Sequence, residues 1–138
     1  MILNNELVAF PTETVYGLGG LATSDIAVER IFKAKGRPND NPLIVHVHKE
    51  YDLSKLVYVE FDYVKDLIHA FMPGPLTLVM KSKGTVSKNV TCGLDTLAVR
   101  IPDHEGCQEF LRYLDLPIAA PSANISGSPS PTRVLRVR

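Results

Sequence analysis

A helical pattern that stops abruptly and runs into a short apolar strand, over residues 24–47, constrains this chain more than any other feature. The helical part, residues 24–34, has an apolar face made of Ala27, Val28, Ile31 and Phe32. Gly36 and Pro38 follow directly, and these residue types commonly end a helix. The next run, residues 43–47, is apolar, rich in β-branched side chains and bounded by turn residues, so it predicts a strand. A helix, a stiff turn and a strand therefore follow one another within 24 residues.

The turn between this helix and strand carries two cations, Lys35 and Arg37. Pro38 and Pro42 fix the φ angle on either side of it, which pre-organises the backbone. The cations would then point across the turn from the helix end, where an anionic ligand could meet them. They would also stabilise the helix C-terminus through the macrodipole without any ligand. On these residues alone both interpretations stay open.

Two further polar residues are predicted within apolar strands, His46 and Arg100. Alternation places His46 on one face of residues 43–47, with Ile44 and His48, and it places Arg100 on one face of residues 96–101. An arginine inside an apolar strand must find an anion or reach water. A structural salt bridge would satisfy Arg100, and an ordinary hydrogen-bonded, half-buried histidine would account for His46. A ligand site is the alternative in both cases.

Polar groups also gather at the ends of two other apolar runs. Residues 7–10 predict a strand, and Thr12, Glu13, Thr14 and Tyr16 follow it closely. Residues 116–120 predict a strand buried on both faces, and Ser122 and Asn124 come just after it. Polar side chains at strand ends are a common setting for small-ligand sites in open sheets. The small, proline-stiffened run 126–132 that follows is also explained as a linker.

The remaining segments predict short elements joined by turns. Residues 51–56 predict a short helix or turn. The next helix is capped by Asp62 and has Val64, Leu67, Ile68 and Phe71 as its core face, with His69 on its surface. A strand at 76–81 and a loop at 82–95 with a short helix near 86–90 follow, and then a helix at 106–114 with Phe110, Leu111 and Leu114 as its core face. The predicted fold class is α+β (mixed αβ), a twisted, open, mostly mixed β-sheet flanked by helices. One domain is expected over residues 1–138.

The bulk composition excludes several classes of protein. The chain has 138 residues, 45% of them hydrophobic, and its 15 Lys and Arg balance 15 Asp and Glu. A zero net charge predicts no long-range attraction of polyanions. No apolar run is long enough to span a bilayer and no signal peptide is recognisable, so a cytoplasmic protein is expected. Cys92 and Cys107 lack the close spacing of zinc ligands and are expected to be reduced and structural.

Five segments, in order along the chain, resemble the YrdC/Sua5 family of threonylcarbamoyl-AMP synthases. They are PTETVYGLG at residues 11–19, KGRPNDNPLIVHV at 35–47, PGPLTLVM at 73–80, LAVRIPDH at 97–104 and APSANISGSPSPT at 120–132. No GxGxxG helix start or phosphate-binding GxxxxGK[ST] loop is present. The resemblance implies a YrdC/RibB-like fold.

The resemblance implies an enzyme that condenses L-threonine, bicarbonate and ATP into threonylcarbamoyl-adenylate and pyrophosphate. This adenylate is the activated intermediate for t6A at position 37 of transfer RNAs. Mg²⁺ is implied as well, bound through the ATP phosphates and not in a metal cage of the protein. Other proteins would then transfer the threonylcarbamoyl group to the RNA.

The same resemblance assigns roles to individual positions. Lys35 and Arg37 match the family's KxR motif and are the expected catalytic cations. The positions that match contacts to L-threonine are Thr14, His46, Arg100 and Ser122. The positions that match contacts to ATP are Arg37, Asn41, Thr96, Asn124 and Thr132.

Two departures from the family pattern lead to further expectations. The chain begins almost at its first strand and ends shortly after residue 132 with RVLRVR, so a fragment truncated at both ends, with an incomplete nucleotide site, is expected. One alternative function is a double-stranded RNA-binding module, whose affinity would fall steeply with salt. Another is the related domain of carbamoyltransferases of hydrogenase maturation, although the cysteine-rich zinc motifs of those larger proteins are missing here.

Overall fold

A computed structural model describes residues 7–11, 16–35, 42–59, 61–74, 76–121 and 133–136. The strands are β1 Val8–Pro11, β2 Tyr16–Leu21, β3 Ile44–His46, β4 Leu76–Lys81, β5 Thr96–Arg100, β6 Ile118–Ala120 and β7 Arg133–Arg136. The helices are α1 Asp25–Lys35, the 3-10 turn η2 Leu53–Lys55, α2 Asp62–Phe71, α3 Lys88–Thr91 and α4 Glu105–Leu114. Each helix and strand expected from the sequence is present, within a few residues of its predicted bounds.

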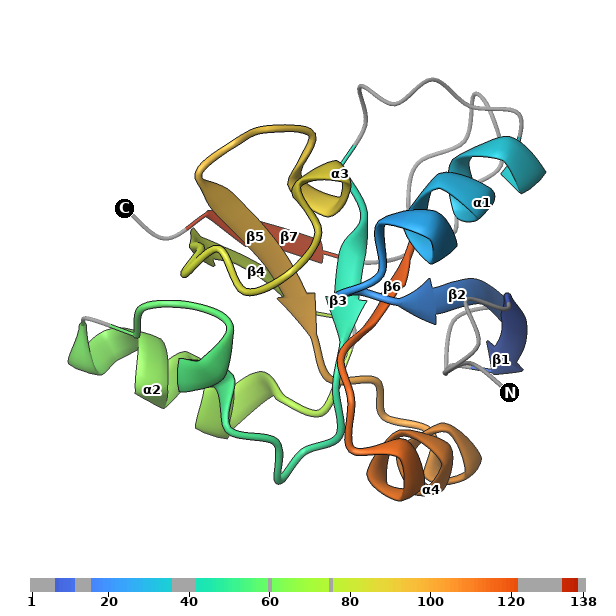
Figure 1. Cartoon of the computed structure of the whole chain (residues 1–138). Coiled ribbons are helices and arrows are strands. Elements are labelled where there is room, and N and C mark those ends of the chain that lie inside the picture. The colour runs from blue at the N-terminus through green and yellow to red at the C-terminus, as the bar shows by residue number, and fades with distance from the viewer. Residues whose placement is uncertain are drawn as a thin grey trace.

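The strands form one seven-stranded sheet in the order β1-β2-β6-β3-β5-β4-β7. Two pairs, β3 with β5 and β4 with β7, are parallel, and the other four pairs are antiparallel. Figure 1 shows β1 and β7 at opposite edges of this sheet, with α1 and α3 near one end of the strands and α2 and α4 near the other. The predicted α+β class with a mixed, helix-flanked sheet is confirmed.

One face of the three adjacent strands β3, β5 and β4 is entirely apolar, and we call it the core face. It consists of Val45 from β3, Leu78 and Met80 from β4, and Leu97 and Val99 from β5. None of these side chains is more than 1% exposed. They belong to the main hydrophobic cluster, which also includes Val28, Ile31 and Phe32 of α1. The alternation expected within residues 43–47 and 96–101 is thus confirmed.

Helix α1 forms where the sequence predicts it, because its capping residues and its apolar face both favour a helix there. The side chain of Ser24 accepts a hydrogen bond from the Ala27 backbone N–H at 3.1 Å, which satisfies one of the free donors at the helix start. Asp25 lies in the first turn, where a negative charge is favourable. The helix ends at Lys35, just before the cation-bearing turn.

A smaller hydrophobic cluster joins α4 to β6. Cys107 and Leu111 of α4 pack with Ile118 and Ala120 of β6, and all four are buried. Asp115 ends the helix in the left-handed conformation, with φ of 52°. Both cysteines, Cys92 and Cys107, are free thiols, as the sequence indicates.

Two details of α2 differ from the sequence-based expectation. Asp62 does not cap the helix: the N-cap is Phe61, which makes no side-chain capping hydrogen bond, and Asp62 is the first helical residue. Phe71 was expected on the core face but is 56% exposed, because the helix ends at that residue and turns into Met72 and Pro73. The expected surface position of His69 is confirmed.

The C-terminal run of the sequence also differs from its expected character. Its residues 133–136 form β7, which pairs in parallel with β4, whereas no element was expected there from the sequence. None of the helices in the described part of the chain combines the length and apolar character needed to cross a bilayer.

Candidate functional site

The second face of β3, β4 and β5 carries buried polar residues, and we call it the site face. His46 of β3 pairs directly with Arg100 of the parallel strand β5, and Arg100 pairs directly with Thr77 of the antiparallel strand β4. Directly paired residues point to the same face of a sheet and lie about 5 Å apart at Cβ. The three side chains therefore form one row across three strands, and each is 5% exposed or less.

Arg100 is held in place by the turn that follows α2. Its Nε donates a hydrogen bond to the Gly74 carbonyl oxygen at 3.1 Å. The Gly74 N–H in turn donates to the carbonyl oxygen of Ile101 at 2.8 Å, so the turn and the end of β5 hold each other. A side chain at residue 74 would place its Cβ 2.6 Å from the Phe71 carbonyl oxygen, so only glycine fits there. This turn orients the guanidinium, and sequence patterns gave no sign of that role.

His46 is a neutral imidazole in this setting. Burial lowers its pKa to about 4, and the positive charge of Arg100 acts in the same direction. Its Nδ1 lies 3.2 Å from the Ile44 carbonyl oxygen. Backbone hydrogen bonds at Ile44 and Ile118 raise the pKa, but burial and Arg100 outweigh them. The row thus presents a buried cation beside a neutral ring, which suits a small ligand that carries an anionic group.

The hydroxyl of Thr77 completes the row, and its chemistry differs from that of its neighbours. Thr77 is fully buried, and within the described residues its Oγ1 is the buried side-chain atom that lacks a hydrogen-bond partner. An unpaired buried polar atom is uncommon in folded proteins and calls for an explanation. This feature could not be predicted, because the strand pattern of residues 76–81 does not distinguish a buried threonine from a solvent-facing one.

Thr96 and Lys35 are the other two predicted site residues that the structure describes. Thr96 is on the site face of β5 as well, four residues before Arg100, which corresponds to roughly 13 Å along a strand. Ala98 lies between them and is partly exposed, and its paired neighbours Ile44 and Val79 are buried. Lys35 is the last residue of α1, one residue beyond the helix end expected at residue 34. The roles predicted for Thr96 and Lys35 stay predictions.

A polar cluster secures the chain just after His46. His48 is buried and its Nε2 donates to Asp115 Oδ1 at 2.7 Å, while its Nδ1 accepts from the Glu50 N–H at 3.2 Å. The hydrogen bond from His48 lowers the pKa of the Asp115 carboxyl group. Gln108 of α4 accepts from the Lys49 N–H and donates to the Pro102 carbonyl oxygen. Helix α4 therefore ties the end of β3 to the segment after β5, the two strands that carry His46 and Arg100.

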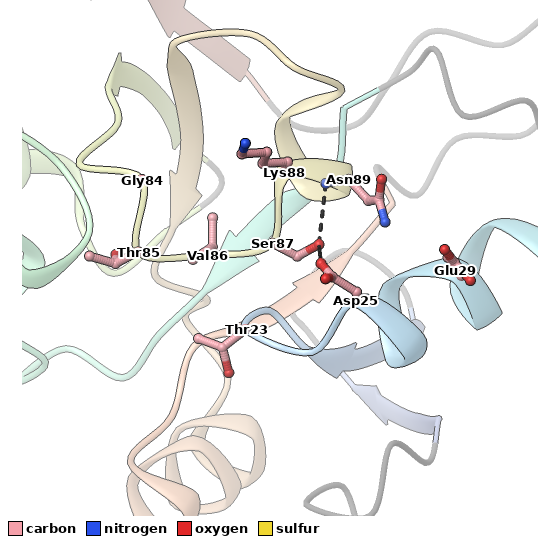
Figure 2. Close-up of a pocket in the computed structure, with 9 residues that line it drawn as sticks. All are labelled: Thr23, Asp25, Glu29, Gly84, Thr85, Val86, Ser87, Lys88 and Asn89. Atoms are coloured by element: carbon pink, nitrogen blue, oxygen red, sulfur yellow. Dashed lines mark hydrogen bonds between the residues drawn. The ribbon is translucent and has the colours of Figure 1, made fainter.

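A cavity of about 590 Å³ lies elsewhere, between the start of α1 and the segment before α3 (Figure 2). It is lined by Thr23, Asp25, Glu29, Gly84, Thr85, Val86, Ser87, Lys88 and Asn89. Ser87 donates to Asp25 and accepts from the Asn89 N–H, so one hydroxyl joins α1 to α3. A second cavity, of about 380 Å³, borders Leu94 and Asp95, just before Thr96. Neither includes His46 or Arg100, and the sequence analysis pointed to neither.

The structure brings together only part of the predicted site. His46 and Arg100 are neighbours, and Thr96 and Lys35 have the places given above. Six predicted site residues, Thr14, Arg37, Asn41, Ser122, Asn124 and Thr132, lie outside the described residues. Their roles stay predictions. Within the described ranges, no group of three or more His, Cys, Asp or Glu side chains is placed to hold a metal ion.

Comparison with known proteins places this geometry in a family. The model of the family Sua5_yciO_yrdC, described as "Telomere recombination", matches residues 1–138. The chain is 50% identical over 138 residues to threonylcarbamoyl-AMP synthase of Bacillus subtilis and 53% identical over 131 residues to that of Pyrococcus abyssi. It covers 40% and 38% of those two proteins, and the alignments include 99% and 95% of this chain.

A solved structure agrees with the sequence comparison. The crystal structure of P. abyssi Sua5 complexed with L-threonine superposes with a TM-score of 0.85 at 52% sequence identity. The match covers 94% of this chain and 38% of that one, so the chain spans well under half the length of these relatives. A full-length family match, a shared fold and high sequence identity agree, and the chain belongs to the Sua5/YciO/YrdC family.

Proposed function

We propose that this chain forms threonylcarbamoyl-AMP and pyrophosphate from L-threonine, bicarbonate and ATP, in the cytoplasm, for the t6A modification of transfer RNA. The observation that carries the proposal is the buried pair of Arg100 and neutral His46 on the site face. The pair occurs in a chain about half identical to proteins named threonylcarbamoyl-AMP synthase.

The amino acid would bind at this pair. An arginine anchored through Nε at Gly74 presents its guanidinium in a fixed orientation, and a guanidinium can hold a carboxylate through two parallel hydrogen bonds. Neutral His46 adds no second positive charge beside the substrate ammonium group. Thr14 and Ser122 are the other proposed contacts to threonine.

The chemistry then requires positioning more than a protein nucleophile. The threonine nitrogen attacks the carbon of bicarbonate and, with loss of water, gives an N-carboxy amino acid. Its carboxylate oxygen attacks the α-phosphorus of ATP, and the bond from that phosphorus to the pyrophosphate oxygen breaks. Negative charge builds on the phosphoryl oxygens, where Lys35 and Arg37 are proposed to stabilise it. Asn41, Thr96, Asn124 and Thr132 are the proposed remaining contacts to the nucleotide.

Mg²⁺ is proposed to enter with ATP, on the phosphate oxygens. The described residues offer no carboxylate cluster that would fit a separate metal cage, so no step above depends on a metal held by the protein. The adenylate would pass to other proteins that transfer the threonylcarbamoyl group to RNA. No described feature favours the RNA-binding or carbamoyltransferase alternatives.

Pyrophosphate release by the purified full chain tests the proposal. Release should require L-threonine, bicarbonate and ATP together, and threonylcarbamoyl-AMP should be detected by mass spectrometry. Arg37→Ala should abolish release while the circular dichroism spectrum stays that of the parent. Arg112→Ala is the control, because Arg112 is exposed and its ion pair with Glu50 is on the surface. Release that does not need threonine, or parental turnover by Arg37→Ala, would refute the assignment.

A further inference from the structure

The buried hydroxyl of Thr77 is the feature that the proposed function leaves unused. It is fully buried, and among the buried side-chain nitrogens and oxygens of the described segments it is the one without a partner. Two other buried hydroxyls in the described segments are paired: Ser87 donates to Asp25, and Thr91 donates to the Lys88 carbonyl oxygen at 3.2 Å. Burying an unpaired hydroxyl is unfavourable, and valine would fill the same volume without that cost.

The location of Thr77 indicates what could supply the missing partner. Thr77 is paired directly with Arg100, which is paired directly with His46, so its side chain points to the site face. Its neighbours in the strand, Leu76 and Leu78, point to the opposite face, toward the main hydrophobic cluster. A group that meets the Thr77 hydroxyl therefore belongs to the face that carries Arg100.

The chemistry of Arg100 restricts that group further. A guanidinium offers only hydrogen-bond donors, so Arg100 cannot accept the proton of the Thr77 hydroxyl. An anion held by Arg100 would bring acceptor oxygens to the same place. A carboxylate has two oxygens and room for more hydrogen bonds than one arginine supplies.

We propose that Thr77 is a further substrate-binding residue, whose hydroxyl donates a hydrogen bond to the amino acid carboxylate that Arg100 holds. This inference rests on the proposed function, since it takes an α-amino acid as the ligand. The hydroxyl is then unpaired in the free protein and paired in the complex, so its energetic benefit is confined to the bound state. Removing it should strengthen the free fold and weaken binding, and these opposite signs distinguish a binding role from a packing role.

The experiment measures thermal unfolding and L-threonine affinity, by calorimetry, for the full chain and three variants at residue 77. Thr77→Val should raise the unfolding midpoint of the free protein and weaken L-threonine binding about tenfold, the size expected for a lost hydrogen bond to a charged group. Thr77→Ser keeps the hydroxyl and should bind within about threefold of the parent. Thr77→Ala also lacks the hydroxyl, so it should show the same loss of affinity even if Thr77→Val does not fold.

Thr91→Val is the matched control, because Thr91 is similarly buried and its hydroxyl is already paired. It should lower the unfolding midpoint and leave the L-threonine affinity unchanged. If the parent binds L-threonine and both Thr77→Val and Thr77→Ala bind equally well, this inference is overturned and the proposed function stands. If the parent does not bind L-threonine with or without ATP, both are overturned.

Discussion

The core face of β3, β4 and β5 and the row of His46, Arg100 and Thr77 on their site face are equally buried and chemically opposite. They alternate residue by residue: Val99 precedes Arg100, Leu78 follows Thr77, and Val45 precedes His46 in the same strands. All six side chains are 5% exposed or less. One face gains stability by removing apolar surface from water, while the other places a charge, an imidazole and a hydroxyl in the same low-dielectric interior. The comparison separates a face that stabilises the fold from a face on the opposite side of the same strands that we propose binds the ligand.

The comparison can be tested because neighbouring residues can be changed separately. A substitution on the core face should change the free energy of unfolding and leave ligand affinity intact. A substitution on the site face should do the reverse, or should act through charge and pH. The four predictions below follow from this division, beginning with the largest expected effect.

Leu78→Ala should cause the largest loss of stability. Leu78 is fully buried in the main hydrophobic cluster, and truncating such a side chain leaves a cavity that costs roughly 2–5 kcal/mol. Urea denaturation should show a lower midpoint with an unchanged slope. The L-threonine affinity of the folded variant should match that of the parent. A loss of stability below about 1 kcal/mol would mean that this face is loosely packed. The core face would then contribute less to the stability of the fold than its burial indicates.

Acidification should weaken the fold through His46, on the site face. The pKa of His46 is lowered from 6.5 to about 4 in the folded chain, so between these values the unfolded chain binds a proton that the folded chain does not. Stability then rises with pH in this window: the contribution of His46 is complete above pH 6.5 and is lost as the pH falls to 4. The loss is on the order of 3 kcal/mol.

Urea denaturation at several pH values from 7 to 4 measures this effect, and variants identify its source. His46→Gln should flatten the dependence of stability on pH in the window. His69→Gln removes an exposed histidine and serves as the control, with the parental dependence retained. An equally steep dependence in His46→Gln would show that another group dominates the acid response.

Arg100→Lys should separate charge from geometry on the site face. Lysine keeps the positive charge but lacks the planar fork that binds a carboxylate through two hydrogen bonds. It also cannot reproduce the Nε contact to Gly74. We expect L-threonine affinity to fall about tenfold, equivalent to about 1.4 kcal/mol, while the fold is retained. Calorimetry measures the affinity, and parental binding by this variant would assign the carboxylate to another residue.

Much of this division was predictable from the sequence, because alternation in a strand is a local property. Residues 43–47 and 96–101 were assigned to the correct faces, and His46 and Arg100 stood out as polar residues in apolar strands. Local pattern does not give strand register, so the direct pairing of His46 with Arg100 required the tertiary fold. The same limit applies to Thr77, whose unusual feature is a missing partner and not its residue type.

The wrong expectations have local physical causes. Asp62 has the residue type of a helix cap, but capping depends on the backbone conformation of one residue, and here that residue is Phe61. Phe71 fits the apolar spacing of α2, yet the helix ends there and its side chain faces solvent. No strand was expected at residues 133–136, because four residues with one β-branched side chain give little local signal, and β7 is recognised by its pairing with β4. The roles of Thr14, Arg37, Asn41, Ser122, Asn124 and Thr132 stay predictions.

Ser87→Ala should have the smallest effect and should leave both faces unchanged. The Ser87 hydroxyl donates to Asp25 and accepts from the Asn89 N–H, so its loss removes the link between α1 and α3 and the cap of α3. Loss of a serine cap typically costs about 1 kcal/mol. Neither the pH dependence due to His46 nor the affinity for L-threonine should change, because Ser87 contacts neither His46 nor Arg100 in the described structure. If Ser87→Ala weakened L-threonine binding as much as Arg100→Lys does, the α1 and α3 junction would be part of the binding apparatus, and ligand affinity could no longer be assigned to one face of the sheet.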